Sequence, residues 1–380
     1  MPKHVPPVFL ILRICFSTCL FGCYATKPYL CGMQQTKTAR LQYIDAMRGI
    51  AVVLIVFGHM WFAYGDYHSF FSFRDITGML RLPILFFVSG FVFTSKPLGW
   101  CSGGGYFILK KVRQLLLPAI VIGGVFALVS GLSAREMLVD IWKGGYWFML
   151  TLFEYMVAQT IVECLTSGRG IERTGSRYAA TLIIMAIVLY VMSVRPVYSR
   201  AGMAGDIIQL SKLRYFIYFA AGRLVRIHMT RLLQWRWRDM VVALIIATFV
   251  ALAVGSWAHV GIGTGSGVFF YLRWALFEMT ALLSIFFFFY RQRVWFASDG
   301  WLPRTLAYVG RHTLEIYMLH YFLLPKDLQV VGRFFTEHPA PIVELLVAGV
   351  IAIAIAAVCL LIGEIIRSSR FLHRWVLGGK

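Results

Sequence analysis

The chain has 380 residues, of which 59% are hydrophobic and 14% charged, whereas about 25% of residues are charged in ordinary soluble domains. This composition excludes a soluble globular protein and predicts an all-α, polytopic membrane protein. A net charge of +20 would suit a nucleic-acid-binding protein if it formed one stripe. The basic residues lie between apolar runs instead, which excludes nucleic acid as a partner and is typical of the positive-inside pattern of membrane proteins.

Residues 1–32 are predicted to be an N-terminal extension that precedes a functional domain of residues 33–380. Within the extension, residues 8–24 are apolar apart from Arg13 and a few small polar residues. At about 17 residues this stretch is short for a membrane span and long for the apolar part of a signal peptide. We favour translation from Met33, which would leave the extension without a function. A signal peptide and an eleventh span are the alternatives.

The seven cysteines indicate neither a metal site nor a disulfide framework. Four of them lie in the first 31 residues, and Cys101, Cys164 and Cys359 are scattered through the rest. No pair has the C-x-x-C spacing of a structural metal site. We therefore expect no metal ion and no bound cofactor.

Ten apolar runs follow, most of them about 18 to 25 residues long, which is the length that a helix needs to cross about 30 Å of hydrocarbon. The runs are residues 43–64, 76–95, 114–133, 146–165, 178–195, 213–227, 240–258, 267–290, 305–325 and 341–366. The sixth is the weakest, because it is short and is interrupted by Arg223. The sequence therefore predicts a bundle of about ten transmembrane helices.

Lys and Arg residues alternate between rich and poor connections along these runs. The rich connections precede the first run and follow every second run, ending with the basic C-terminal segment. Because basic residues concentrate on the cytoplasmic side, we expect the rich connections there. An even number of spans then places both termini in the cytoplasm, in a multi-pass protein of the inner (plasma) membrane.

The first run carries the sharpest functional candidates, because a charged group in hydrocarbon costs several kcal/mol unless it is paired or hydrated. Arg48 and His59 are eleven residues apart, which on a helix is about 20° from superposition and about 16 Å along the axis. Both are expected to face one cavity, with Arg48 at the cytoplasmic mouth and His59 near mid-membrane. Asp45 is close enough to pair with Arg48. His59 is a candidate general base, with an inter-helix hydrogen bond as the alternative role.

Other polar residues within the runs are candidates for substrate contacts or for structural pairs. They are Ser89, Glu154, Glu278, Glu315 and His320. Ser89 and Gly90 are small, so they predict a close approach of two helices. Arg81 is a natural partner for one of the acids, so at least one acid is expected to be structural.

Six stretches occur in a recognisable order. They are IDAMRG to GH at 44–59, LPILFFVSGF at 82–91, KKVRQLLLP at 110–118, YWFMLTLF at 146–153, YFIYFAAGRLVR at 215–226 and GRHTLEIYMLH at 310–320. Together they resemble the acyltransferase-3 family of integral membrane acyltransferases over residues 41–366. A single Arg-x10-His spacing is a weak signal, whereas six motifs in order are specific.

This resemblance implies transfer of an acyl group, usually acetyl, from cytosolic acyl-CoA to a hydroxyl of a sugar or cell-envelope glycan. It implies that His59 is the catalytic residue and that Arg48 contacts acyl-CoA. The basic segment Lys110, Lys111 and Arg113 is expected to attract the phosphates of coenzyme A. The same three residues equally fit a plain topology signal.

Acyl-CoA is thus expected as a co-substrate, and the other partners are the glycan acceptor and the lipid bilayer. In the simplest mechanism His59 deprotonates the acceptor hydroxyl, and a covalent acyl-histidine relay is the variant. Trp147, in the fourth motif, is expected to support the site. The sequence leaves the acceptor, the acyl chain and the oligomeric state open.

The main alternative is a secondary transporter or flippase of a polar or lipid-linked envelope metabolite, because ionisable residues near the midplane suit one. Against it, the sequence contains no internal repeat and no pair of interrupted helices. A receptor or scaffold without chemistry is the third possibility. Arg48 and His59 on one helix face argue against that possibility.

Overall fold

The computed structural model describes residues 41–60, 73–93, 104–167, 175–236, 238–257, 268–325, 328–338 and 340–378. The predicted extension of residues 1–32 lies outside these ranges, and residues 42–380 form one compact unit. Within the described ranges every regular element is a helix, which confirms the all-α prediction.

Helices occupy most of the described residues. Those of the first half are α2 (Gln42–His59), α4 (Phe73–Phe91), α5 (Gly104–Lys111), the π-helical turn η2 (Val112–Leu116), α6 (Leu117–Ser130), α7 (Ala134–Val139), η3 (Lys143–Gly145), α8 (Trp147–Ser167) and α9 (Ser176–Met192). Those of the second half are α10 (Arg195–Tyr198), η4 (Ser199–Ala201), α11 (Gly202–Ile207), η5 (Leu210–Tyr215), α12 (Phe216–Gln234), α13 (Arg238–Trp257), α14 (Val268–Arg291), α15 (Arg293–Phe296), α16 (Trp301–Arg311), α17 (Thr313–Leu323), α18 (Gln329–Glu337), α19 (Pro341–Ser368) and α20 (Arg370–Val376).

Each of the ten predicted runs contains a helix, but two differ from the prediction in a way that matters for the site. The helix of the first run, α2, ends at His59, five residues before the predicted end of the run. The ninth run is divided at His312 into α16 and α17. The end of α2 at His59 lies on the wall of the cavity described below, and α17 contributes Tyr317 and Tyr321 to the same wall.

Four of the described helices are long and apolar enough to cross a bilayer: Gly105–Ser130, Trp147–Thr166, Leu272–Arg291 and Ile342–Ser368. A fifth is reached if Ser176–Met192 and Arg195–Ile207, which bend by 68°, form one broken span. Several other predicted runs carry charges within the helix, such as Asp45 and Arg48 in α2. The apolar helices indicate a membrane protein, and the total of ten spans stays a prediction.

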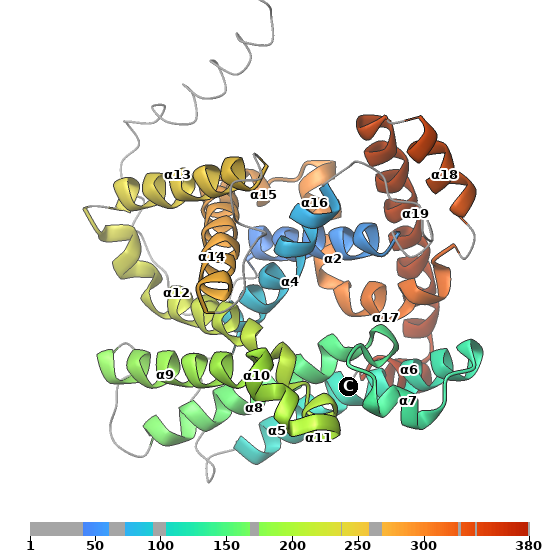
Figure 1. Cartoon of the computed structure of the whole chain (residues 1–380), viewed down its shortest axis with the longest axis horizontal. Helices are drawn as coiled ribbons and strands as arrows, with labels where there is room; N and C mark the ends of the chain where they lie inside the picture. The colour runs from blue at the N-terminus through green and yellow to red at the C-terminus, as the bar shows by residue number, and fades with distance from the viewer. Residues whose placement is uncertain are drawn as a thin grey trace, which may run out of the picture. The chain divides into compact units, whose positions relative to one another are not determined.

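The central helix is α2, which packs against α4, α16, α17 and α19 (Figure 1). Its residues Ala51, Val52 and Val56 are fully buried. The contact with α16 is a backbone contact, because a side chain on Gly49 or Gly310 would overlap the backbone of the other helix. The helix that carries both principal candidates is therefore held rigidly in the core.

The close approach predicted at Gly90 is confirmed. A side chain on Gly90 would overlap the backbone of α12, and a side chain on Gly222 would overlap the backbone of α4. Small residues at such crossings allow membrane helices to pack closely. The neighbouring Ser89 donates a hydrogen bond of 2.7 Å to the carbonyl of Leu85 within α4.

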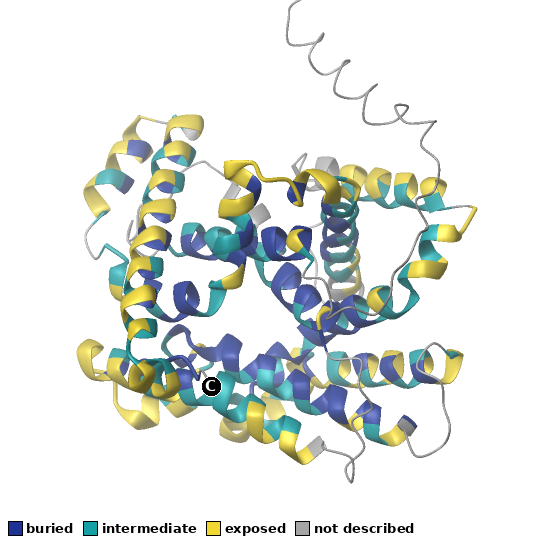
Figure 2. Ribbon diagram, turned by 180° about the vertical axis from the view of Figure 1, so that it is seen from behind, coloured by how far each residue is buried: buried dark blue, intermediate teal, exposed yellow. Residues whose placement is uncertain are grey.

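The 28-residue helix α19 presents one apolar face to its surroundings. The exposed large residues of that face are Ile342, Leu346, Val350, Ile353, Leu361 and Ile365. On the opposite face Ala348, Ala352 and Cys359 are buried, and Figure 2 shows the exposed and half-buried residues along this helix. An apolar face without protein cover on such a long helix is suited to contact with lipid.

Candidate active site

A cavity of about 730 Å³ lies where α2, α4, α6 and α17 approach the segment before α8. This volume is within the range of about 300–1,000 Å³ typical of ligand sites. The lining residues are Ile55, His59, Arg81, Leu82, Phe126, Ser130, Trp142, Gly144, Gly145, Trp147, Phe148, Tyr317, Tyr321, Leu324 and Pro325. Two predicted site residues, His59 and Trp147, are therefore on its wall.

His59 is the last residue of α2 and faces this cavity. Its Nε2 atom lies 3.1 Å from the hydroxyl of Tyr321 in α17. Its ring also stacks on that of His320, with centroids 5.2 Å apart and planes inclined by 27°. The helix ends at this residue, and its predicted position near mid-membrane stays a prediction. His59 is thus placed by a helix terminus and by two rings of α17.

The tautomer of His320 follows from its hydrogen bonds. Its Nδ1 atom lies 3.0 Å from the carbonyl of Ile316 and 2.9 Å from that of Tyr317. Because a carbonyl oxygen can only accept, Nδ1 must carry a proton. The ring is fully buried, and Nε2 has no hydrogen-bond partner among the described residues. His320 is therefore held in a fixed orientation against His59.

Arg81 brings a positive charge to the same wall. Its guanidinium crosses α2 at Gly58, where any side chain would overlap it. In this position its charge acts on His59, His320 and Tyr321. The glycine before His59 therefore allows a cation of α4 to lie beside the imidazole.

A tight turn before α8 forms another part of the wall. Lys143, Gly144 and Gly145 all have positive φ angles, of 50°, 57° and 99°. A side chain on Gly145 would overlap the ring of Tyr321, and its carbonyl accepts a hydrogen bond of 2.6 Å from Tyr317. Glycine is therefore required here both by the backbone conformation and by the closeness of α17.

Lys143 anchors this turn despite its strained backbone. Its buried ammonium group donates to the carbonyls of Leu138, Asp140 and Asp206, the last two at 3.2 and 3.1 Å. These carbonyls belong to the end of α7, the following turn and α11. One side chain thus joins three segments behind the cavity wall.

The acyltransferase-3 family model, described as an acyltransferase domain, matches residues 41–361. The chain belongs to this family. The matched range contains every residue that lines the cavity, so the resemblance inferred from the six motifs is confirmed. No curated protein and no solved structure matches the chain.

Two tryptophans on the cavity wall of this acyltransferase make cation–π contacts with a buried lysine. The Nζ atom of Lys212 lies 3.5 Å from the ring centroid of Trp142 and 4.7 Å from that of Trp147. Desolvation by burial and, to a lesser extent, the charge of Arg214 lower the pKa of Lys212 to about 7, although Asp140 acts in the opposite direction. The contact supports the predicted supporting role of Trp147, which stays a prediction.

The predicted donor residues of the acyltransferase lie elsewhere along the chain. Arg48 is half-buried in α2, and Lys111 is half-buried within electrostatic range of it. Lys111 also lies over the ring of Phe107, 5.4 Å from its centroid. Lys110 is exposed, and Arg113 is half-buried in η2. The structure thus brings Arg48 and Lys111 near each other, while a role in acyl-CoA binding stays a prediction.

The π-helical turn η2 interrupts the predicted basic segment. The N–H of Leu117 donates to the carbonyl of Val112, five residues earlier. The cause is Pro118, which has no N–H to donate and whose ring would clash with the carbonyl of Gln114 in a regular α-helix. Such turns often mark functional sites within helices.

Five predicted supporting residues are not among those that line the cavity: Asp45, Ser89, Glu154, Glu315 and His320. Glu315 pairs with Arg367 of α19 and lies 3.2 Å from Nδ1 of His312. Glu154 is half-buried, and its Oε2 has no hydrogen-bond partner among the described residues. Asp45 is buried in the first turn of α2.

Two of the membrane acids are structural, as the sequence led us to expect for at least one. Glu315 forms the ion pair with Arg367. Glu278 accepts hydrogen bonds from the hydroxyl of Tyr218 and, at 3.0 Å, from the indole N–H of Trp274.

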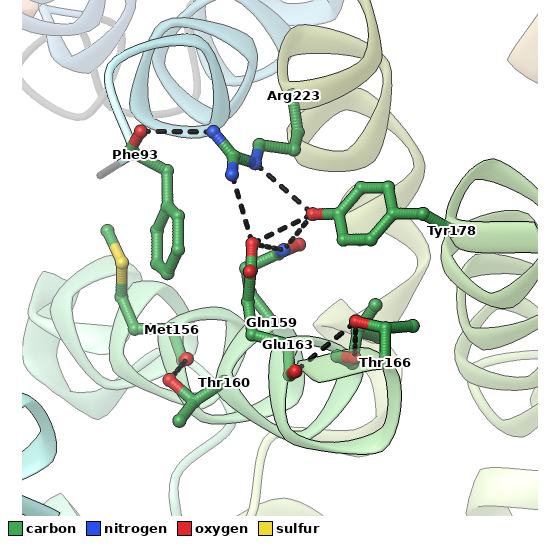
Figure 3. Close-up of polar contacts among 9 residues, drawn as sticks. Phe93, Met156, Gln159, Thr160, Glu163, Thr166, Tyr178 and Arg223 are labelled. Atoms are coloured by element: carbon green, nitrogen blue, oxygen red, sulfur yellow. Dashed lines mark hydrogen bonds and ion pairs between the residues drawn. The ribbon is translucent and has the colours of Figure 1, made fainter. Parts of the chain in front are cut away.

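The arginine that interrupts the sixth run is fully buried in an ion pair (Figure 3). Nη2 of Arg223 lies 3.0 Å from Oε1 of Glu163, and Nη1 donates to the carbonyl of Phe93 at 3.2 Å. Gln159 and Tyr178 donate to the same carboxylate oxygen at 3.1 and 2.9 Å. Arg223, the charge in the weak sixth run, therefore links α8, α9 and α12 through this ion pair and its hydrogen bonds.

Sequence reasoning did not identify Tyr321, Tyr317 and Trp142 as parts of the site. Tyr321 follows His320 directly, and Tyr317 lies one helical turn before Tyr321. That spacing places both tyrosines on one helix face, and this is the sequence feature from which they could have been identified. The helix that they face, however, follows only from the tertiary structure.

Proposed function

We propose that this acyltransferase transfers an acyl group, acetyl in the simplest case, from cytosolic acyl-CoA to a hydroxyl of a sugar or cell-envelope glycan. The observation that carries the proposal is the Nε2 atom of His59, which faces a ligand-sized cavity 3.1 Å from a hydroxyl group. A general base must lie within hydrogen-bond distance of the proton that it takes, so the acceptor hydroxyl would take the place of the Tyr321 hydroxyl at this nitrogen. In this proposal the protein lies in the plasma (inner) membrane with both termini in the cytoplasm.

In the proposed mechanism the acceptor hydroxyl binds beside Nε2 of His59. The imidazole takes its proton while the oxygen attacks the thioester carbonyl, and the carbonyl oxygen becomes an oxyanion. Arg81, on the same wall, stabilises that developing charge. The C–S bond then breaks, and the thiolate of coenzyme A receives the proton from His59. A covalent acyl-histidine is the variant of this scheme.

The donor is proposed to reach His59 along the face of α2 that starts at Arg48. The two residues lie on one face of the helix about 16 Å apart along its axis, so the phosphates of coenzyme A would lie near Arg48 while the thioester lies near His59. Lys111 adds positive charge beside Arg48. Lys110 and Arg113 extend this charge, which would attract the polyanionic donor.

Replacing Arg48 with alanine is expected to raise the apparent KM for acetyl-CoA about tenfold or more, since hydrogen bonds to charged groups contribute about 1.5–3 kcal/mol. The value of kcat should change little, because the contact is made equally in the ground and transition states. Initial rates of coenzyme A release over a range of acetyl-CoA concentrations test this. Arg135→Ala, at an exposed residue of α7, is the matched control. An unchanged KM in R48A would contradict the donor role.

The transfer itself is tested with membranes from cells that express the chain, incubated with labelled acetyl-CoA. We expect label in the envelope polysaccharide fraction, and none from cells that lack the protein. The transporter alternative predicts the opposite outcome: purified protein in vesicles would move a solute, and no label would be transferred.

A further inference from the structure

The catalytic cavity offers few polar groups to a ligand. Its lining is mainly aliphatic and aromatic. The hydroxyl of Tyr317 already donates to the carbonyl of Gly145, and the hydroxyl of Tyr321 is engaged with His59. Among the described lining residues, the side chain of Ser130 and two indole N–H groups are the further uncharged donors. The wall is therefore poorly equipped to satisfy a sugar ring.

A sugar ring and an apolar chain can be compared by the binding affinity that each loses or gains in this cavity. A sugar ring brings several hydroxyls, and each one buried without a partner would weaken binding by on the order of tenfold. An apolar chain gains about fourfold in affinity for every methylene removed from water. An acetyl group ends in a single methyl and would by itself fill only a small part of about 730 Å³. The lining thus favours a hydrocarbon chain.

We propose that this cavity is an acyl-chain pocket and that the preferred donor is a thioester with a linear apolar chain longer than acetyl. This rests on the proposed function, in which the thioester carbonyl lies at His59. Coenzyme A lies on the Arg48 side of that carbonyl, so the chain must extend in the other direction. It would lie against Leu82 and Phe148.

We assign the hydrocarbon chain in the cavity to the acyl donor rather than to a lipid-linked acceptor, because the two differ in where their hydrocarbon is attached. An acyl chain is bonded to the carbonyl carbon that His59 serves, so it necessarily starts inside the cavity. The lipid of a lipid-linked sugar is separated from the reacting hydroxyl by the sugar itself. Its tail would lie in the surrounding bilayer, against faces such as the exposed one of α19.

The test is equilibrium competition on the wild-type protein in lipid nanodiscs. Labelled acetyl-CoA is displaced by butyryl-, hexanoyl- and octanoyl-CoA. We expect about a fourfold tighter Kd for each added methylene until the pocket is filled. Equal or weaker binding of the longer thioesters would overturn the acyl-chain pocket and leave the proposed acetyl transfer standing. If neither acetyl-CoA nor any longer thioester binds, the proposed donor itself fails.

A tryptophan substitution in the pocket wall tests where the acyl chain of the donor lies. Leu82→Trp should remove the advantage of octanoyl-CoA over acetyl-CoA, because the indole occupies the pocket. Leu324→Trp, on a different segment of the wall, is the second variant if the first does not fold. Leu272→Trp, at an exposed position of α14, controls for partition of the chain into the nanodisc. Unchanged preference for octanoyl-CoA in both folded wall variants would overturn the proposal.

Discussion

Alanine in place of His59 is expected to lower acyl transfer by about 10²–10⁴-fold, the usual contribution of a general base. The imidazole faces the cavity from the end of α2, and no other histidine is among the described lining residues. The measurement is transfer from labelled acetyl-CoA by purified protein, together with the amount of protein that inserts into the membrane. Full activity in H59A would contradict the assignment.

Two further variants separate the chemistry of His59 from its packing. His338→Ala removes an exposed imidazole from the turn after α18 and should leave transfer unchanged. Tyr321→Phe keeps the ring beside His59 and removes the hydroxyl that lies 3.1 Å from Nε2. If that hydroxyl only orients the imidazole, the rate of acyl transfer should fall about tenfold, well below the fall in H59A.

Methionine in place of Arg223 is expected to destabilise the protein by about 3–5 kcal/mol, because the Glu163 carboxylate would lose its counter-ion in a buried site. Both side chains are at most 1% exposed. Thermal unfolding of the purified protein, followed by the loss of monodisperse material, measures the effect. The exposed pair Arg304 and Asp299 supplies the control, since Arg304→Met should change stability little.

The double variant R223M/E163L tests whether the cost lies in the unpaired charge. Removing both charges leaves no buried ion, so stability should recover most of what either single change loses. Single variants as stable as the wild type would show that the network of Figure 3 does not stabilise the fold. A double variant as unstable as R223M would place the cost in packing rather than in charge.

The sequence by itself determined the fold class, the family and the helix that carries the principal candidates. These features are local, because a long apolar run must satisfy its backbone internally in lipid and therefore forms a helix. The relation between Arg48 and His59 is local too, since a fixed rotation and rise per residue place both on one face of α2. The close approach at Gly90 followed from the size of the residue alone.

Only the tertiary structure decided what surrounds His59. Arg81 reaches it across Gly58, and Tyr321 and His320 reach it from α17. The tertiary structure also assigned the membrane acids, because an apolar run does not reveal which neighbour a buried carboxylate meets. Helical periodicity states which residues share a face, but the partner of that face depends on packing between segments hundreds of residues apart. The sequence therefore identified the candidate catalytic residue, while packing determined the cavity that it faces.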